Sequence, residues 1–198
     1  MRWATALGVG VVLLAGGSLV ARAALTRQLA DVFERKLVAV QTRAGAGGEA
    51  PLTTVIAEDE VNSYLRFKSA DQLPVGLTEP AFTLLGGQRF TARAVVDLDL
   101  VRQKRGTGSW FDPTSYLAGK MPVSATGVLK TAEGRARFEL ERAEMSGVAV
   151  PKSLLQQILT YFTRSADRPG GAGLDDTYKM PAEIQRLKVE RGRAVVIQ

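Results

Sequence analysis

Two residue types are missing from this 198-residue chain, which contains no cysteine and no histidine. The lack of cysteine excludes disulfide bonds, thiol redox chemistry and metal sites built from thiolates. The lack of histidine removes the commonest general base and metal ligand, and with them every catalytic arrangement of the Ser-His or Cys-His type. The sequence therefore cannot form the common catalytic and metal-binding sites that depend on cysteine or histidine.

Catalytic motifs that need no histidine are also missing. The chain has no Gly-x-Ser-x-Gly nucleophile elbow and no Ser-x-x-Lys pair. Its glycine-rich stretch at 45–48 lacks the spacing and the preceding strand of a phosphate-binding loop. We therefore expect a protein that is not an enzyme and that uses no metal ion or cofactor.

Carboxylates are the remaining candidates for chemistry. Asp97 and Asp99 are two residues apart in a predicted strand and would share one face, where they could hold a divalent cation or act as a glycosidase pair. The alternative is a solvated strand face. The acids at 58–60 suit the first turn of a helix, whose dipole favours negative charge there. Asp175 and Asp176 have too few acidic neighbours for a calcium loop.

The N-terminus predicts a targeting segment, residues 1–23. Arg2 precedes an uncharged, mostly apolar run from Trp3 to Ala21, and a small-x-small pattern around Arg22 would allow cleavage after Ala23. The alternative is an uncleaved membrane anchor, because about 18 apolar residues can span a bilayer. Five Gly and Ser residues in the run weaken its hydrophobicity. Either interpretation places the protein outside the cytoplasm, in the periplasm or cell envelope; a buried core helix of a cytoplasmic protein is the third.

The charge balance agrees with an envelope location. The chain has a net charge of +6, and residues 24–198 carry 24 of the 26 Lys and Arg residues against all 20 acids, a net charge of +4. A mild positive balance suits an anionic lipid surface. It is too small and too scattered to predict nucleic-acid binding.

An amphipathic helix is predicted over 24–43, where apolar residues recur every three or four positions. A flexible linker over 44–51, rich in glycine and ended by Pro51, follows it. The helix would be either a juxtamembrane stalk or part of the fold. Packing against the fold is the interpretation we favour, because its apolar stripe needs cover.

Residues 52–198 predict one α+β domain with a curved antiparallel sheet packed on or wrapped around amphipathic helices. A strand at 52–56 leads into a helix over 57–67, and apolar residues alternate with polar ones from Phe90 to Val101. The remaining expected features are strands around 123–129 and 136–140 joined by a turn at Glu133-Gly134, a bend near Glu141-Arg142, a helix from Pro151, and a terminal hairpin over 187–197.

A basic and aromatic loop is predicted after the strand that ends near Val101. It contains the cations Arg102, Lys104 and Arg105, followed by Trp110 and Phe111. Such a loop is typical of a membrane-surface contact, in which cations meet lipid phosphates and the aromatic pair enters the headgroup boundary. The alternative is an ordinary loop with the tryptophan folded onto the core.

Apolar strand and helix positions could form either a filled core or the walls of a ligand channel, and periodicity alone does not separate the two. The candidate ligand-lining residues are Val96, Leu98, Phe138, Leu140, Leu154, Ile158, Leu159 and Phe162. The first four come from the predicted strands and the last four from the helix after Pro151.

The segment Ile56–Leu65, which reads IAEDEVNSYL, resembles the opening of several exported bacterial domains in which a strand enters a short acidic helix. Some of those domains are similar to the tubular lipid-binding (TULIP) superfamily, in which a curved antiparallel sheet wraps a long helix around an apolar tunnel. The resemblance implies binding or transfer of a membrane lipid in the envelope, without catalytic residues.

Three functional hypotheses follow. The first is an envelope lipid-binding or lipid-transfer protein that also contacts the membrane surface. The second is a membrane-anchored module that binds another envelope protein and holds no ligand. The third is a hydrolase that acts on glycans through Asp97 and Asp99.

Overall fold

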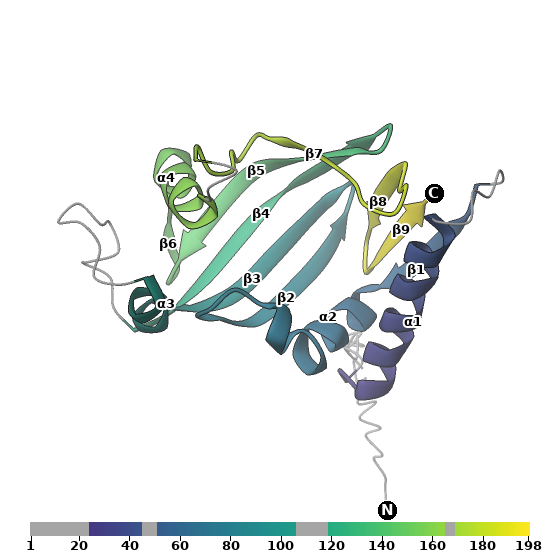
Figure 1. The fold of residues 1–198 in the computed structure, drawn as a ribbon, viewed down its shortest axis with the longest axis horizontal. Coiled ribbons are helices and arrows are strands. Elements are labelled where there is room, and N and C mark those ends of the chain that lie inside the picture. Colours follow the sequence, from purple (N-terminus) through teal and green to yellow (C-terminus); the bar gives the residue numbers. More distant parts are fainter. Residues whose placement is uncertain (1–23, 45–50, 106–118, 165–168) are drawn as a thin grey trace, which may run out of the picture.

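The computed structural model describes residues 24–44, 51–105, 119–164 and 169–198, which form an α+β fold with two antiparallel sheets (Figure 1). The described helices are α1 (Arg27–Ala44), α2 (Glu58–Phe67), the short 3₁₀ helix η1 (Ala70–Gln72), α3 (Leu98–Arg105) and α4 (Lys152–Thr163). The described strands are β1 (Thr53–Ala57), β2 (Leu77–Gly86), β3 (Arg89–Asp97), β4 (Lys120–Ala132), β5 (Arg135–Met145), β6 (Val148–Ala149), β7 (Thr177–Lys179), β8 (Arg186–Glu190) and β9 (Arg193–Ile197).

The larger sheet is a meander with the order β2-β3-β4-β5-β6, and β7 also pairs with β5. The predicted turn at Glu133-Gly134 joins β4 to β5, with positive φ at both residues, as tight hairpin turns require. Farther along, Thr126 faces Arg142 whereas Gly127 faces Leu140, so one residue of β5 has no counterpart on β4. This β-bulge confirms the predicted bend near 141–142.

The smaller sheet joins distant parts of the chain in the order β1-β9-β8. The predicted terminal hairpin forms β8 and β9, and β1 pairs with β9 from Thr53 opposite Ile197 to Ala57 opposite Arg193. The prediction of a single bent sheet is therefore wrong, because β1 pairs with the C-terminal hairpin and not with the meander.

The two sheets are bonded together around Gln88, in the tight turn between β2 and β3. The Gln88 backbone N–H donates to the Val189 carbonyl of β8, and its side-chain oxygen accepts the Val189 N–H at 2.6 Å. Its amide nitrogen donates to carbonyls of Leu129 on β4 and Leu187 on β8. One side chain thus satisfies backbone groups of both sheets and fixes their junction.

Helix α1 packs against α2 through polar as well as apolar contacts. The hydroxyl of Ser63, which is fully buried, accepts the backbone N–H of Thr26. Lys36 of α1 pairs with Glu60 of α2 at 2.7 Å. Of the two alternatives for this amphipathic helix, a juxtamembrane stalk or a part of the fold, these contacts support the second.

A second ion-pair group links the two helices at the surface. Lys68 lies 2.5 Å from both Asp31 and Glu34 of α1. The hydrogen bond from Lys68 lowers the pKa of Asp31 below its ordinary value, and the bonds to Asp31 and Glu34 raise the pKa of Lys68. Lys68 therefore acts as a charged link between the helices.

Two polar side chains of α2 bond to the backbone of β2, the edge strand of the larger sheet. Asn62 accepts the backbone N–H of Phe82 at 2.7 Å and donates to the Phe82 carbonyl at 2.8 Å, as a neighbouring strand would. A Glu58 carboxylate oxygen accepts the N–H of Leu84 at 2.7 Å. These side chains occupy hydrogen-bonding groups of an edge strand that would otherwise be available for pairing.

Strand β3 ends earlier than the alternation predicts. The Asp97 carboxylate accepts the backbone N–H groups of Asp99 and Leu100, both at 3.1 Å, and so starts helix α3. The predicted strand to Val101 is therefore wrong for 98–101, and the first part of the predicted basic loop is helical. Leu98 lies in the first turn of this helix and is buried, with 4% of its surface exposed.

Candidate ligand-binding face

The register of the larger sheet gathers apolar side chains on one face. Residues directly opposite one another in paired strands share a face, and successive residues alternate between faces. From Phe90 of β3 this rule traces one surface across four strands, which we call the apolar face. It comprises Leu77, Phe82 and Leu84 of β2; Phe90, Ala92, Ala94 and Val96 of β3; Met121, Val123, Ala125, Gly127, Leu129 and Thr131 of β4; and Ala136, Phe138, Leu140, Ala143 and Met145 of β5.

The opposite, outer face of the sheet is polar. Arg93 donates to the Thr83 hydroxyl at 2.8 Å, and Lys130 pairs with Glu139 at the same distance. The apolar face instead looks toward the smaller sheet, because Thr131 exchanges hydrogen bonds with the backbone of Leu187 on β8. The outer face of this sheet is therefore suited to contact with solvent, and the apolar face to contact with other apolar groups.

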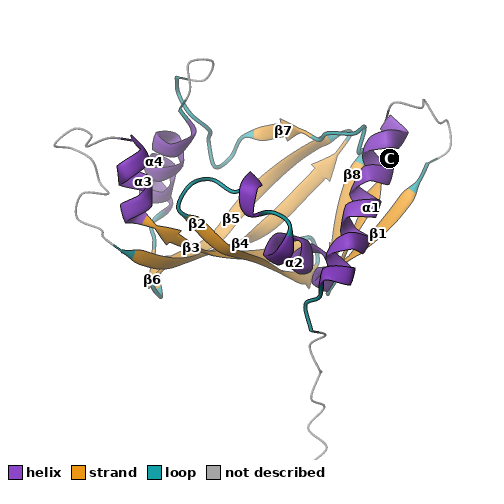
Figure 2. Ribbon diagram, turned by 60° about the horizontal axis from the view of Figure 1, so that its bottom comes forward, coloured by secondary structure: helices purple, strands orange, loops and turns teal. Residues whose placement is uncertain are grey.

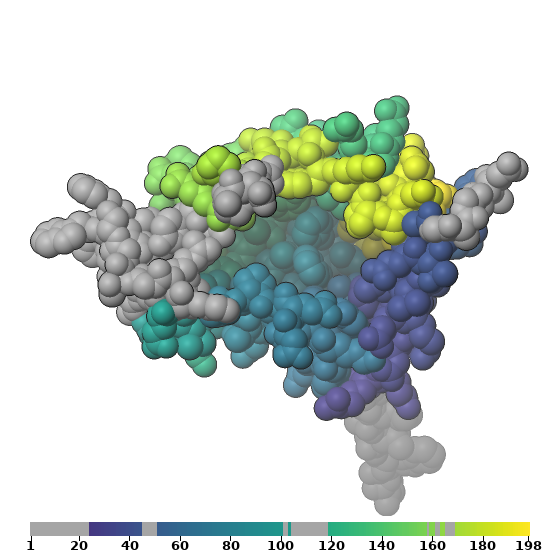
Figure 3. All heavy atoms as spheres, in the orientation of Figure 1, coloured from purple at the N-terminus to yellow at the C-terminus, as the bar shows by residue number. Residues whose placement is uncertain are grey.

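The described residues cover the apolar face incompletely. Every residue that β3 contributes to it is only half-buried, as are Phe138 and Leu140 of β5. Among the described residues, Ser63 is the largest side chain with less than 2% of its surface exposed. Figures 1 and 2 show α3 and α4 at one end of the sheet and the smaller sheet with α1 at the other. Figure 3 shows the molecule hollowed between them.

A row of aromatic rings lies at one end of the apolar face. The Phe90 ring centroid lies 5.8 Å from that of Phe82 and 5.1 Å from that of Phe138. Phe90 and Phe138 meet across β4 at Gly127, where a Cβ atom would lie 2.6 Å from a Phe138 ring carbon. The missing side chain of Gly127 therefore allows the row of rings to form beside the junction of the sheets.

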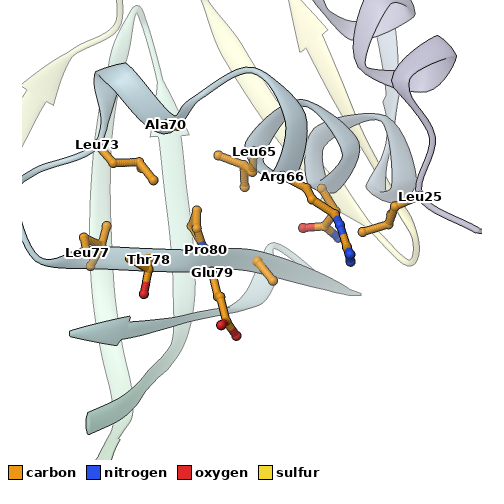
Figure 4. A pocket seen from close by; sticks show the side chains of 11 residues that line it. Leu25, Leu65, Arg66, Ala70, Leu73, Leu77, Thr78, Glu79 and Pro80 are labelled. Atoms are coloured by element: carbon orange, nitrogen blue, oxygen red, sulfur yellow. The ribbon is translucent and has the colours of Figure 1, made fainter. Parts of the chain in front are cut away.

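A pocket of about 930 Å³ opens at the edge of the sheet, between the α2–η1 segment and β2 (Figure 4). This volume is within the range of about 300–1,000 Å³ found for small-molecule sites. The lining residues are Leu25, Asn62, Leu65, Arg66, Ala70, Leu73, Leu77, Thr78, Glu79, Pro80 and Ala81. Leu77 also belongs to the apolar face, because it lies opposite Val96. The pocket and the face therefore meet at this residue.

Three of the predicted ligand-lining residues belong to the apolar face: Phe138 and Leu140 lie near Phe90, and Val96 lies at the other end of β3. Leu98 does not belong to it, because it starts α3. In α4, Leu159 is half-buried and Leu154 has 38% of its surface exposed. The side chains of Ile158 and Phe162 lie outside the described part of the structure.

The predicted membrane-contact residues fall at the end of α3 and beyond it. Arg102, Lys104 and Arg105 lie in this helix, but their side chains are outside the described part. Trp110 and Phe111 also lie outside the described residues. Contact of these residues with the membrane surface stays a prediction from the sequence.

The carboxylates considered for chemistry have structural bonds. Asp97 starts α3, and an Asp99 oxygen accepts the Gly119 N–H at 3.0 Å, so the two do not form a pair on a strand face. Asp175 binds Lys152, which lowers the pKa of that carboxyl. The described residues contain no group of three acidic side chains arranged to hold a metal ion. No helix within those residues is both long and apolar enough to cross a membrane.

The pocket is the feature that the sequence does not reveal. Its walls come from Leu25 before α1, from α2 and η1, and from the start of β2. The helical pattern places Leu65 on an inner face, and Pro80 is a signal for an edge strand, where a missing N–H is tolerated. Neither signal shows that these segments enclose a space, since this depends on how they pack.

Compared with models of known protein families and with curated proteins, the chain has no match. The resemblance of Ile56–Leu65 to the tubular lipid-binding proteins therefore stays a prediction from the sequence pattern. Within that segment, Glu58 and Asn62 bond to β2 and Glu60 bonds to α1, so its polar residues have structural roles here.

Proposed function

We propose that the protein binds a membrane lipid, or a ligand of similar apolar character, on the apolar face of the larger sheet. The observation that carries the proposal is a continuous apolar surface across β2–β5 that remains half-buried beneath a hollow. A sheet normally hides such a face under a helix or a second sheet. A bound acyl chain would give the same cover.

The energy available from such binding is substantial. Removing apolar surface from water is favourable by about 25 cal/mol per Å². A ligand that covered roughly 200 Å² of the face would therefore gain about 5 kcal/mol before the costs of association. The row of Phe82, Phe90 and Phe138 would bound the ligand at the junction end.

A binding role also agrees with the residues available. The chain has no histidine or cysteine, and Asp97 and Asp99 are engaged by backbone N–H groups. In this proposal the protein works without catalysis, either as a lipid-binding or as a lipid-transfer protein. Residues 1–23 would direct it out of the cytoplasm, and the basic and aromatic residues from Arg102 to Phe111 would contact the membrane surface.

Native mass spectrometry of the full chain, released from detergent micelles, tests the proposal. We expect a population that carries one lipid from the producing cell, identified after extraction into organic solvent. Phosphatidylglycerol added to the delipidated protein should restore the adduct at a stoichiometry of one. A bare mass at every lipid concentration would overturn the proposal and favour the second hypothesis, a module that binds another envelope protein.

A further inference from the structure

The pocket beside the apolar face has two chemically different parts. Leu65 and Leu73 approach from the α2–η1 side, and Leu77 and Pro80 face them from β2 (Figure 4). This part is a slot between aliphatic side chains. At its other end lies the guanidinium of Arg66, beside Leu25. An apolar slot ending at a cation matches the two parts of an anionic amphiphile.

Arg66 is available for an anion. Among the described residues, no carboxylate lies within ion-pair distance of its guanidinium. Its described contact is with the Phe67 ring, 5.7 Å from the ring centroid, and Arg27 lies 5.4 Å from the same ring. Two guanidinium groups therefore lie near one aromatic side chain. A guanidinium binds carboxylate or phosphate oxygens through two parallel hydrogen bonds.

One carboxylate also lines the pocket and opposes an anion there. Glu79 lies on β2, at a residue with φ of 52° where the pairing of β2 with β3 shifts register. Figure 4 shows its carboxylate pointing below β2, away from Leu65 and Leu73. The slot itself therefore remains apolar, and the positive charge at its end comes from Arg66.

The pocket is continuous with the proposed binding surface. Leu77 contributes to both, and Val96 lies directly opposite it on β3. A ligand with its head at Arg66 can therefore extend a chain past Leu77 onto the apolar face.

We infer that the pocket between α2–η1 and β2 selects an anionic amphiphile, with its phosphate or carboxylate head on Arg66 and its acyl chain running over Leu77 onto the apolar face. The inference rests on the proposed function and adds the chemical class of the ligand. A neutral or zwitterionic lipid would gain the same apolar contact and lack the net attraction to the guanidinium.

The test compares phosphatidylglycerol with phosphatidylcholine of identical acyl chains, each added to the delipidated full chain and measured by native mass spectrometry. We expect the protein to prefer the anionic lipid by about tenfold, as for one charge-assisted contact. Arg66→Gln should bring the ratio close to one, while Arg66→Lys should keep part of it. Arg93→Gln, on the outer face, is the matched control and should keep the full ratio.

Two further measurements separate the contributions of the acyl chains and of the charge at Arg66 to binding. Glycerophosphoglycerol, which carries the head without chains, should not compete at concentrations where the intact lipid binds. Raising the salt concentration should reduce the preference of the unchanged protein, because the contact at Arg66 is exposed. This second measurement requires no variant, so it holds even if Arg66→Gln destabilises α2.

The outcomes distinguish a failure of the role inferred for Arg66 from a failure of the proposed lipid binding. Equal binding of both lipids, or a preference that survives both Arg66→Gln and high salt, would overturn the role of Arg66 and leave lipid binding intact. Competition by the free head group would overturn the requirement for a chain. Binding of neither lipid would remove the proposed function itself.

Discussion

Two parts of the larger sheet, a few residues apart on β3, differ in the side chains and hydrogen bonds that surround them. Beside Phe90, the turn at Gln88 bonds to both sheets, and three aromatic rings meet over Gly127. At Ala94, in the middle of the strand, the same face is lined by small and branched side chains, and Ala94 is half-buried just as Phe90 is. The first region joins the two sheets and is called the junction; the second, where we propose that the ligand lies, is called the hollow.

The difference shows how the fold is held while part of an apolar surface stays accessible. At the junction, the backbone groups of Leu129, Leu187 and Val189 find partners in Gln88, so the two sheets are fixed in position. At the far edge, Asn62 and Glu58 do the same for β2. These hydrogen bonds hold the sheet at the junction and at the β2 edge. The domain can therefore keep its shape without side chains packed over the middle of the apolar face.

The largest loss of stability is expected from adding a side chain at Gly127, in the junction. Gly127→Ala places a methyl group against the Glu139 carbonyl oxygen and 2.6 Å from a Phe138 ring carbon, so β5 as well as the ring has to move. Overpacking of this kind costs about 2 kcal/mol of unfolding free energy. Urea unfolding of the two proteins measures the loss directly.

Gly170→Ala is the matched control for this change. A methyl group added at Gly170 would meet no atom within 4 Å, and this residue does not have a positive φ. Its substitution should change stability by no more than about 0.5 kcal/mol. Equal stability of the two variants would show that neither the Glu139 carbonyl nor the Phe138 ring crowds Gly127, and the junction would then not be tightly packed.

The hollow should respond differently to the same kind of enlargement. Ala94→Phe adds a ring to the apolar face where the side chains are half-buried. We expect it to change stability by less than about 1 kcal/mol, because open space accommodates the ring, whereas a filled core would lose more. Lipid occupancy in native mass spectrometry should fall several-fold.

Val95→Phe is the control, because Val95 is the next residue of β3 and points to the outer face. It should keep the lipid adduct. If Ala94→Phe instead destabilised the protein by about 3 kcal/mol, the middle of the face would be a closed core. If it kept full lipid occupancy, the ligand would lie elsewhere.

Local features of the sheet were predictable from the sequence. The alternation of 123–129 and 136–140, the turn at Glu133-Gly134 and the bulge near 141–142 all follow from patterns that short segments carry by themselves. The helix after Pro151 is of the same kind, although the structure starts it at Lys152. Each depends on residues within a few positions of one another.

The predictions that went wrong depend on contacts between distant segments. Nothing in β1 itself indicates that it pairs with β9 and not with the meander. Asp97 continues the alternation of β3 and also suits the start of a helix, and only the chain around it decides between the two. The pocket and the bonds from Asn62 to Phe82 likewise arise from packing of α2 on β2.

The smallest effect is expected at the surface link between α1 and α2, which belongs to neither the junction nor the hollow. Lys68→Met removes the hydrogen bond that lowers the pKa of Asp31, so this pKa should return toward its ordinary value in a titration followed by carboxyl-carbon NMR. Lys188→Met, an exposed lysine of β8, should leave it unchanged.

The sign of the stability effect follows from these two pKa shifts. Because the pKa of Asp31 is lowered on folding, its contribution is present above the unfolded pKa and is lost as the pH falls through the folded one. The pKa of Lys68 is raised, so its contribution is lost only as the pH rises through the folded value. Lys68→Met should therefore lower the melting temperature slightly at neutral pH and not at all in strong acid. An equal loss in acid would mean that Lys68 acts through packing of its aliphatic stem and not through its charge.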